Sequence, residues 1–291
     1  AHKAGSGTTI EGESVSLSPG YYLLVDSTGS LGGNDAYNSA LLQVTKSGGI
    51  TIEKKYSVPT VDKSVKTTDG EAGEAADAGI GDSVTFTLKG TLPENYDDFE
   101  EYTYQFTDTL SAGLDYQEKS AVVKLYESEE AFKNDTEGTG GTNLTGQCDF
   151  ETAATDGETT LTWTFADLKT VPDAAYGNVI VVTYKALLNS NAEVGSAGNP
   201  NKVTLTYSND PNHTGTGTPP TGITPPDEVL VFTYEIDGEK VDGEDHGKKL
   251  EGAEFILYRG IDGEEPGEDD ADGNPTGVEY ALVDNGKLAG W

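Results

Sequence analysis

The sequence predicts an all-β fold built of antiparallel sandwich domains. Two observations favour it: apolar and polar residues alternate in several short runs, and no long apolar helical run is present. The 37 glycines, together with many threonines and tyrosines, also suit strands and tight turns. A chain of 291 residues is long enough for about two or three domains of ordinary size.

The longest coherent unit covers residues 57–212. Period-two alternation predicts strands around Val84–Leu88, Tyr102–Leu110, Leu161–Phe165 and Val203–Tyr207. Residues 179–188 are more continuously apolar, which indicates a central strand, and residues 128–133 suggest a short helix. The Gly-, Thr- and Asn-rich segment 134–146 is expected to be an exposed loop.

Incomplete domains are expected on both sides of this unit. Residues 1–56 contain strand-like runs at 21–25, 40–44 and 50–52, which we interpret as the C-terminal part of an N-terminal β domain. Residues 213–226 form a Pro- and Gly-rich linker. Residues 227–291 start a further domain, with Leu230, Phe232, Tyr234 and Ile236 predicted to share one strand face. The chain also contains no Met, which indicates a portion of something longer.

Composition excludes several classes of function. The formal net charge of −33 repels nucleic acid and anionic membranes, and no apolar run is long enough to span a bilayer. Because Cys148 is the only cysteine and the three histidines are scattered, we expect no disulfide within the chain, no metal site and no cofactor. The acidic segment 262–274 lacks the spacing of a calcium loop and is interpreted as a solvated loop.

Strand parity places polar side chains among apolar ones in three predicted strands. Lys63 alternates with Val61 and Val65, Asp108 with Phe106 and Leu110, and Asn209 with Leu205 and Tyr207. A Lys, an Asp and an Asn in one core are costly unless they satisfy each other. The alternative interpretation is a lysine that reaches water and an aspartate that caps a turn.

Such a trio has a specific chemistry open to it. Burial lowers the pKa of a lysine and raises the pKa of an aspartic acid. A neutral amine can attack the Asn carboxamide, while a protonated Asp hydrogen-bonds its carbonyl oxygen and shuttles protons. The product is an isopeptide bond, with ammonia released. The fold supplies the effective molarity. Because the reaction happens once within the chain, the protein is not expected to be an enzyme.

Four segments carry a family resemblance. Residues Pro59–Val65, Gly81–Phe86, Tyr104–Leu114 and Asn199–Pro211 resemble the middle domain of Gram-positive backbone pilins. The resemblance implies tandem immunoglobulin-like sandwiches of the Cna B type, with a Lys–Asn isopeptide bond. It assigns Lys63 as the cross-linking lysine and Asp108 as the catalytic aspartate. Asn209 is preferred as the acceptor because it ends the last strand, and Asn201, which has the same parity, is the alternative.

The same resemblance extends to both ends of the chain. Residues 231–258 are similar to the start of the family's C-terminal domain, and Lys240 matches a possible second cross-linking lysine whose partners are absent from this sequence. Lys54 and Lys55 lie where sortase joins such subunits, although the usual Tyr-Pro-Lys context is missing. Two exposed interdomain lysines are the alternative there.

The resemblance therefore implies a structural shaft or stalk protein on the cell-wall-anchored surface or pilus outside the cell, with other pilin subunits as sortase-linked partners. The alternative function is a surface adhesin module that binds a host glycan or protein, with or without calcium, since tyrosines and acidic loops are plentiful. No Ser nucleophile elbow, phosphate loop or His-based metal motif supports an enzyme.

Overall fold

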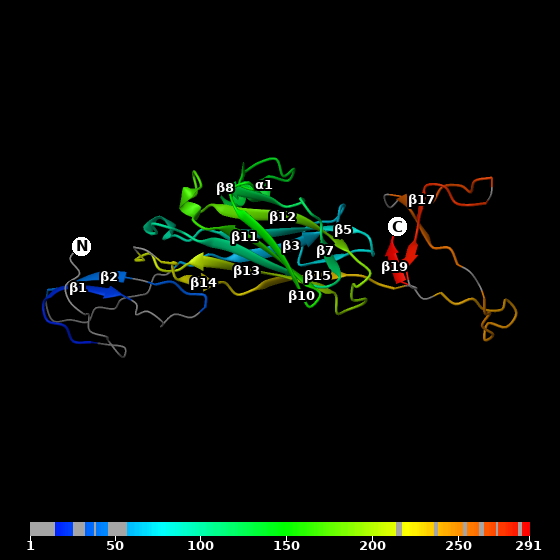
Figure 1. The fold of residues 1–291 in the computed structure, drawn as a ribbon, viewed down its shortest axis with the longest axis horizontal. Helices are drawn as coiled ribbons and strands as arrows, with labels where there is room; N and C mark the ends of the chain where they lie inside the picture. The colour runs from blue at the N-terminus through cyan, green and yellow to red at the C-terminus, as the bar shows by residue number, and fades with distance from the viewer. Residues whose placement is uncertain are drawn as a thin grey trace.

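The computed structural model describes residues 15–25, 33–37, 39–45, 57–213, 217–235, 238–252, 255–261, 265–271, 273–284 and 287–291. Most of the regular structure lies in a central β-sandwich (Figure 1). An N-terminal hairpin lies at one end of the sandwich and short C-terminal strands lie at the other. The three parts follow one another along the long axis of the molecule.

One layer of the sandwich is a seven-stranded sheet. In spatial order its strands are β10 (Asp149–Thr155), β11 (Glu158–Phe165), β6 (Tyr104–Leu110), β13 (Asn199–Ser208), β15 (Asp227–Phe232) and β4 (Ala75–Asp77), with β14 (Thr221–Ile223) also paired to β13. Neighbouring strands are antiparallel except β15 and β4, which run parallel.

The second layer has six strands. They are β3 (Val61–Lys66), β5 (Ser83–Thr91), β12 (Val179–Leu188), β8 (Val122–Tyr126) and β9 (Thr142–Asn143), with β7 (Leu114–Tyr116) also paired to β12. Strand β12 is bonded to β5 along one edge and to β7 and β8 along the other, which confirms the central strand expected over 179–188.

Helical structure in the sandwich is limited to connections. The helix α1 (Glu129–Asn134) begins after Ser128, whose hydroxyl caps it by accepting a 3.1 Å hydrogen bond from the Ala131 amide. Short 3-10 turns lie at η1 (Tyr96–Asp98) and η2 (Leu168–Thr170). The short helix expected from the sequence is therefore confirmed, while the segment expected to be only a loop also contributes the two residues of β9.

Alternating burial along the strands builds the core between the two layers. In β5 and β6 every second side chain is buried and the intervening ones are half-buried. The Tyr184 ring lies 5.4 Å from that of Phe86 and 5.5 Å from that of Trp163, centroid to centroid, and all three are fully buried. Burial of one such side chain is worth about 1.5–3 kcal/mol. The predicted all-β sandwich is confirmed.

The boundary expected at residues 213–226 needs correction. Strands β14 and β15 both pair with β13, so the segment taken as a linker and the start of the next domain complete the central sandwich. Leu230 and Phe232 share one face of β15, as predicted, but that face is half-buried, and the residues that point into the core are Val229 and Val231. All four residues from 229 to 232 are apolar, so the sequence pattern does not show which face of the strand points into the core.

The flanking parts are small. The N-terminal hairpin consists of β1 (Gly20–Val25) and β2 (Ser39–Val44). At the C-terminal end, β16 (Tyr258–Gly260) pairs with β17 (Val278–Tyr280), and β18 (Leu282–Asp284) pairs with β19 (Lys287–Gly290). The expected strand at 50–52, Lys54, Lys55 and Ile236 lie outside the described residues. In the described part of the chain, no helix is long and apolar enough to cross a membrane.

Candidate cross-linking site

Lys63 lies in the middle of β3 and points into the sandwich. Val61 and Val65 are buried on the same face, which is why the strand places the lysine inward. Its ammonium side chain is fully buried and forms an ion pair with Asp108 Oδ1. Burial lowers the pKa of Lys63, while the negative charge of Asp108 opposes that shift. The Lys63 backbone amide donates a 2.6 Å hydrogen bond to Asp227 Oδ2 on β15.

Asp108 approaches from the opposite layer. It lies on β6, paired on one side with Leu161 and on the other with Val203, and it is completely buried. Its two carboxyl oxygens have different partners: Oδ1 accepts from Lys63 and Oδ2 accepts from the Tyr184 hydroxyl. The structure thus brings together the lysine and the aspartate that parity placed inward on separate strands.

Tyr184 is a site residue that sequence reasoning missed. It lies on β12, and its hydroxyl donates to Asp108 Oδ2 and accepts a 2.6 Å hydrogen bond from Asn201 Nδ2. Burial raises the pKa of Tyr184 well above its ordinary value, and the nearby Asp108 charge adds to the rise. Because residues 179–188 read as one apolar run, a tyrosine there looked like ordinary core; only its hydroxyl, which a buried position obliges to find a partner, was a signal.

The asparagine that completes this cluster is Asn201, the sequence alternative. It lies on β13 opposite Leu110 and is fully buried. Its Nδ2 donates to Tyr184, whereas its carbonyl Oδ1 is buried without a hydrogen-bond partner. Leaving a buried acceptor unsatisfied costs about 1–3 kcal/mol. The expected hydrogen bond from the Asp108 carboxyl group to the Asn carbonyl is absent, because the Tyr184 hydroxyl lies between the two groups.

The structure does not bring Asn209 to the lysine. Asn209 follows the end of β13, and the offset of eight residues from Asn201 corresponds to roughly 26 Å along an extended strand. There its backbone carbonyl accepts a 2.6 Å hydrogen bond from the Tyr37 amide of the N-terminal part. The preference for Asn209 is corrected because odd or even position in a strand fixes which face a side chain is on, but not where along the strand it meets the opposite sheet.

Lys240 is solvent-exposed in the described part of the chain, so the structure does not place it in an apolar core.

Among the described residues, no group of three or more His, Cys, Asp or Glu side chains is arranged to hold a metal ion. Burial is the dominant cause of the raised pKa of Cys148, the one cysteine of the chain.

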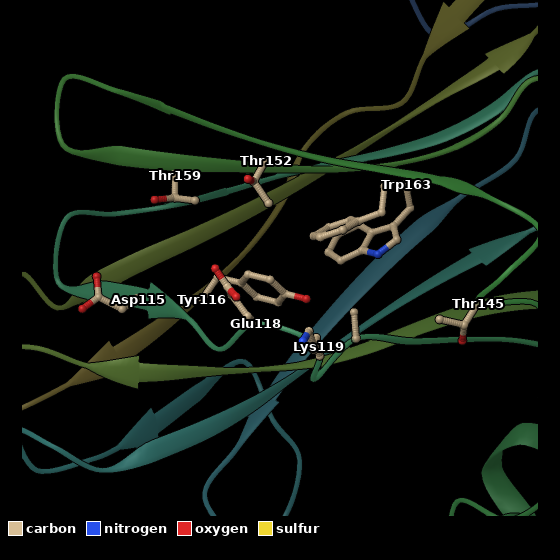
Figure 2. A pocket seen from close by; sticks show the side chains of 10 residues that line it. Asp115, Tyr116, Glu118, Lys119, Thr145, Thr152, Thr159 and Trp163 are labelled. Carbon is tan, nitrogen blue, oxygen red and sulfur yellow. The ribbon is translucent and has the colours of Figure 1, made fainter.

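A separate groove of about 790 Å³ opens at the edge of the sandwich. Figure 2 shows Thr152 and Thr159 along one wall and Asp115, Glu118 and Lys119 along the other. The groove also contains aromatic rings: Phe150 stacks on Trp163 with their centroids 5.2 Å apart, and Tyr116 lies 5.5 Å from Phe150. It combines apolar rings with hydroxyl and charged groups.

Comparison with known proteins identifies the central sandwich. Residues 80–211 match the family described as Gram-positive pilin backbone subunit 2, Cna-B-like domain. The chain is also 27% identical over 219 residues to the trypsin-resistant surface T6 protein of Streptococcus pyogenes serotype M6. That match covers 72% of this chain and 38% of the streptococcal protein, so the chain spans about two fifths of its curated relative.

Two solved structures share the fold. The 35 kDa C-terminal fragment of the major pilin GBS80 of Streptococcus agalactiae superposes with a TM-score of 0.51 at 20% identity, covering 80% of this chain and 79% of that one. The T6 backbone pilin of S. pyogenes superposes with a TM-score of 0.52 at 22% identity, covering 94% of this chain and 57% of that one. The central sandwich is therefore similar, over residues 80–211, to the Cna-B-like domain of Gram-positive pilin backbone subunits.

Proposed function

We propose that this chain is part of a pilus shaft subunit whose central sandwich is locked by a self-formed isopeptide bond between Lys63 and Asn201. One observation carries the proposal. A buried amine, a buried carboxyl group and a buried carboxamide are joined in one hydrogen-bonded chain through Tyr184. A lysine in such surroundings has a lowered pKa, which favours the neutral, nucleophilic amine.

The reaction balances within the chain. Lys63 Nζ adds to Asn201 Cγ, so an Nζ–Cγ bond forms. The Cγ–Nδ2 bond then breaks, and Nδ2 leaves as ammonia. Asp108 accepts a proton from the attacking nitrogen, with which it is already hydrogen-bonded, and releases one proton towards Nδ2, which carries two of its own and so leaves as ammonia. The folded strands hold the groups together, which replaces a slow bimolecular reaction by an intramolecular one.

The bond would join the two layers of the sandwich. Lys63 belongs to the six-stranded sheet and Asn201 to the seven-stranded sheet, and the loop that the link closes contains most of the domain. The loop-closure model used for disulfides gives about 5 kcal/mol of stabilisation. A force that pulls on β3 and β13 would pass through the covalent link, which suits a shaft under shear.

We further propose that the whole protein is displayed outside the cell on a cell-wall-anchored pilus and that its partners are further pilin subunits joined by sortase. The family match and the elongated chain of domains support this placement. The net charge of −33 also opposes loose association between copies, so a stable shaft would depend on specific or covalent contacts.

Intact-mass measurement of purified variants tests the cross-link. The wild-type chain should weigh less than its sequence by one ammonia, and Lys63→Ala, Asp108→Ala and Asn201→Ala should each restore the full mass. Asn209→Ala should retain the deficit and serves as the matched control. A full sequence mass in the wild-type chain, or a deficit lost in Asn209→Ala but kept in Asn201→Ala, contradicts the assignment.

The groove favours a second candidate function, binding of a host glycan at the shaft surface. Sugar rings pack their C–H faces on aromatic rings such as Phe150, while carboxylates and hydroxyls bond their OH groups. A glycan array on wild-type protein tests it, with Phe150→Ala expected to lose binding. Tyr176→Ala, which removes an exposed aromatic outside the groove, should keep it. No glycan bound, or equal binding by both variants, contradicts this function.

A further inference from the structure

The Tyr184 hydroxyl occupies the gap between acid and amide. Asp108 uses one carboxyl oxygen for Lys63 and the other for Tyr184, and Asn201 Nδ2 bonds the same tyrosine hydroxyl at 2.6 Å. Nδ2 is the atom that leaves as ammonia in the proposed cross-linking reaction. A phenol both donates and accepts, so a hydroxyl in this position can pass a proton from the acid to the leaving nitrogen.

We propose that Tyr184 is a catalytic residue that relays a proton from Asp108 to the leaving nitrogen of Asn201. This inference rests on the proposed cross-link and adds the route by which ammonia departs. An amide nitrogen is a poor leaving group unless it is protonated, and the Tyr184 hydroxyl, which accepts a hydrogen bond from Nδ2 before the reaction, is the proton-carrying group that the structure places against it.

The proton transfers balance. In the reactive state the amine is neutral, the carboxyl proton lies on Asp108 Oδ2, and the phenol proton has turned from Oδ2 towards Nδ2. The amine and the acid together then hold the same number of protons as the ion pair. When Nζ adds to Cγ, Nζ loses a proton to Oδ1, Oδ2 gives its proton to the Tyr184 oxygen, and Tyr184 gives its own proton to Nδ2. Nδ2, now pyramidal with a free lone pair, accepts it and leaves as ammonia. Both Asp108 and Tyr184 end with the proton count they had at the start.

The surroundings of Tyr184 suit this role. Its ring is fixed by Phe86, Trp163 and Tyr116, with centroids 5.4, 5.5 and 5.8 Å away. The hydroxyl is therefore held in one place without any contact from solvent, because the residue is fully buried. Because the ring and oxygen are fixed in a water-excluded site, only the phenol proton has to turn before the reaction.

The test follows bond formation in the full chain as it is synthesised. Cell-free translation is quenched at timed intervals, and intact mass gives the fraction that has lost ammonia. Tyr184→Phe keeps the packed ring and removes only the hydroxyl, and should slow the reaction by about a hundredfold. Tyr104→Phe is the matched control, since Tyr104 is equally buried and its hydroxyl donates to the Thr91 carbonyl, away from the cluster.

Two further readouts separate proton relay from simple positioning. The wild-type rate should fall more in D₂O than the Tyr184→Phe rate does, because only the wild type moves its protons through the phenol. If Tyr184→Phe does not fold, 3,5-difluorotyrosine at position 184 keeps the ring and the hydroxyl but makes the phenol more acidic, and the relay predicts a changed rate. A wild-type rate in either variant, or equal effects of D₂O, overturns the relay. A wild-type chain that never loses ammonia overturns the cross-link instead.

Discussion

Lys63 and Asp108 are 45 residues apart in the sequence, yet their side chains form a fully buried ion pair between the two sheets. Each residue alone would leave a costly unpaired charge in the core. Their pairing explains why a strand that opens the domain and a strand from the opposite layer each carry one inward polar side chain. It also places the amine where an asparagine on a third strand is connected to the same acid through one hydroxyl.

Loss of the cross-link should lower stability. We expect Asn201→Ala to unfold in urea with a free energy lower by about 5 kcal/mol than the wild type, because the unfolded chain regains the freedom of the open loop. Equilibrium denaturation followed by tryptophan fluorescence measures this. Asn209→Ala should lose much less, and equal losses in the two variants would argue against a link at position 201.

The uncross-linked chain should respond to alkaline pH in a specific direction. The lowered pKa of Lys63 means that the folded Asn201→Ala variant binds fewer protons than its unfolded state between that lowered pKa and the ordinary 10.5. Its stability should therefore rise with pH through this window. Lys63→Met/Asn201→Ala removes the titrating amine and should lack the rise. Urea unfolding at a series of pH values below 10.5 compares them, and parallel curves would contradict the buried-amine account.

The inward face of β15 can be tested directly. Val231 is fully buried and its neighbour Leu230 is half-buried on the other face. Val231→Asp should destabilise the sandwich by about 3 kcal/mol or more, because it buries an unpaired charge. Leu230→Asp should change stability far less, as measured by thermal unfolding. The opposite order would contradict the burial of Val231 and point to Leu230 as the inward residue.

Close packing at Gly90 predicts a further sensitivity. A Cβ at this position of β5 would overlap the Tyr104 hydroxyl and the Phe106 ring, both fully buried. Gly90→Ala should therefore cost about 1–3 kcal/mol through overpacking. Gly146, where a Cβ would meet nothing within 4 Å, provides the control substitution. Similar melting temperatures for the two alanine variants would be inconsistent with the described packing.

Period-two alternation predicted much of this molecule because burial on one face of a strand is a local property. It placed Lys63 and Asp108 inward, and the continuously apolar run over 179–188 identified the central strand. Alternation could not choose between Asn201 and Asn209, because both are on the same face of the strand. Only the register of β13 against β6 shows which of them lies near Asp108. The Pro- and Gly-rich composition of residues 213–226 led to β15 being assigned to the next domain, because the sheet that a strand joins depends on long-range pairing, which composition does not show.

Tyr184 was missed for a different reason. A tyrosine in an apolar strand is ordinary, and its role depends on two partners from β6 and β13 that only the folded sandwich brings to its hydroxyl. Sequence reasoning that asked where each buried hydroxyl finds its partner would have marked it as a candidate, without naming those partners.

Peptide mapping by tandem mass spectrometry of the protease-digested wild-type chain tests the central claim most directly. We expect one branched species in which the peptide containing Lys63 is joined to the peptide containing Asn201, with the mass of one ammonia missing. Recovery of both peptides as separate, unmodified species, with Lys63 still reactive towards amine reagents after unfolding, would contradict the cross-link and leave the buried cluster as a structural ion pair.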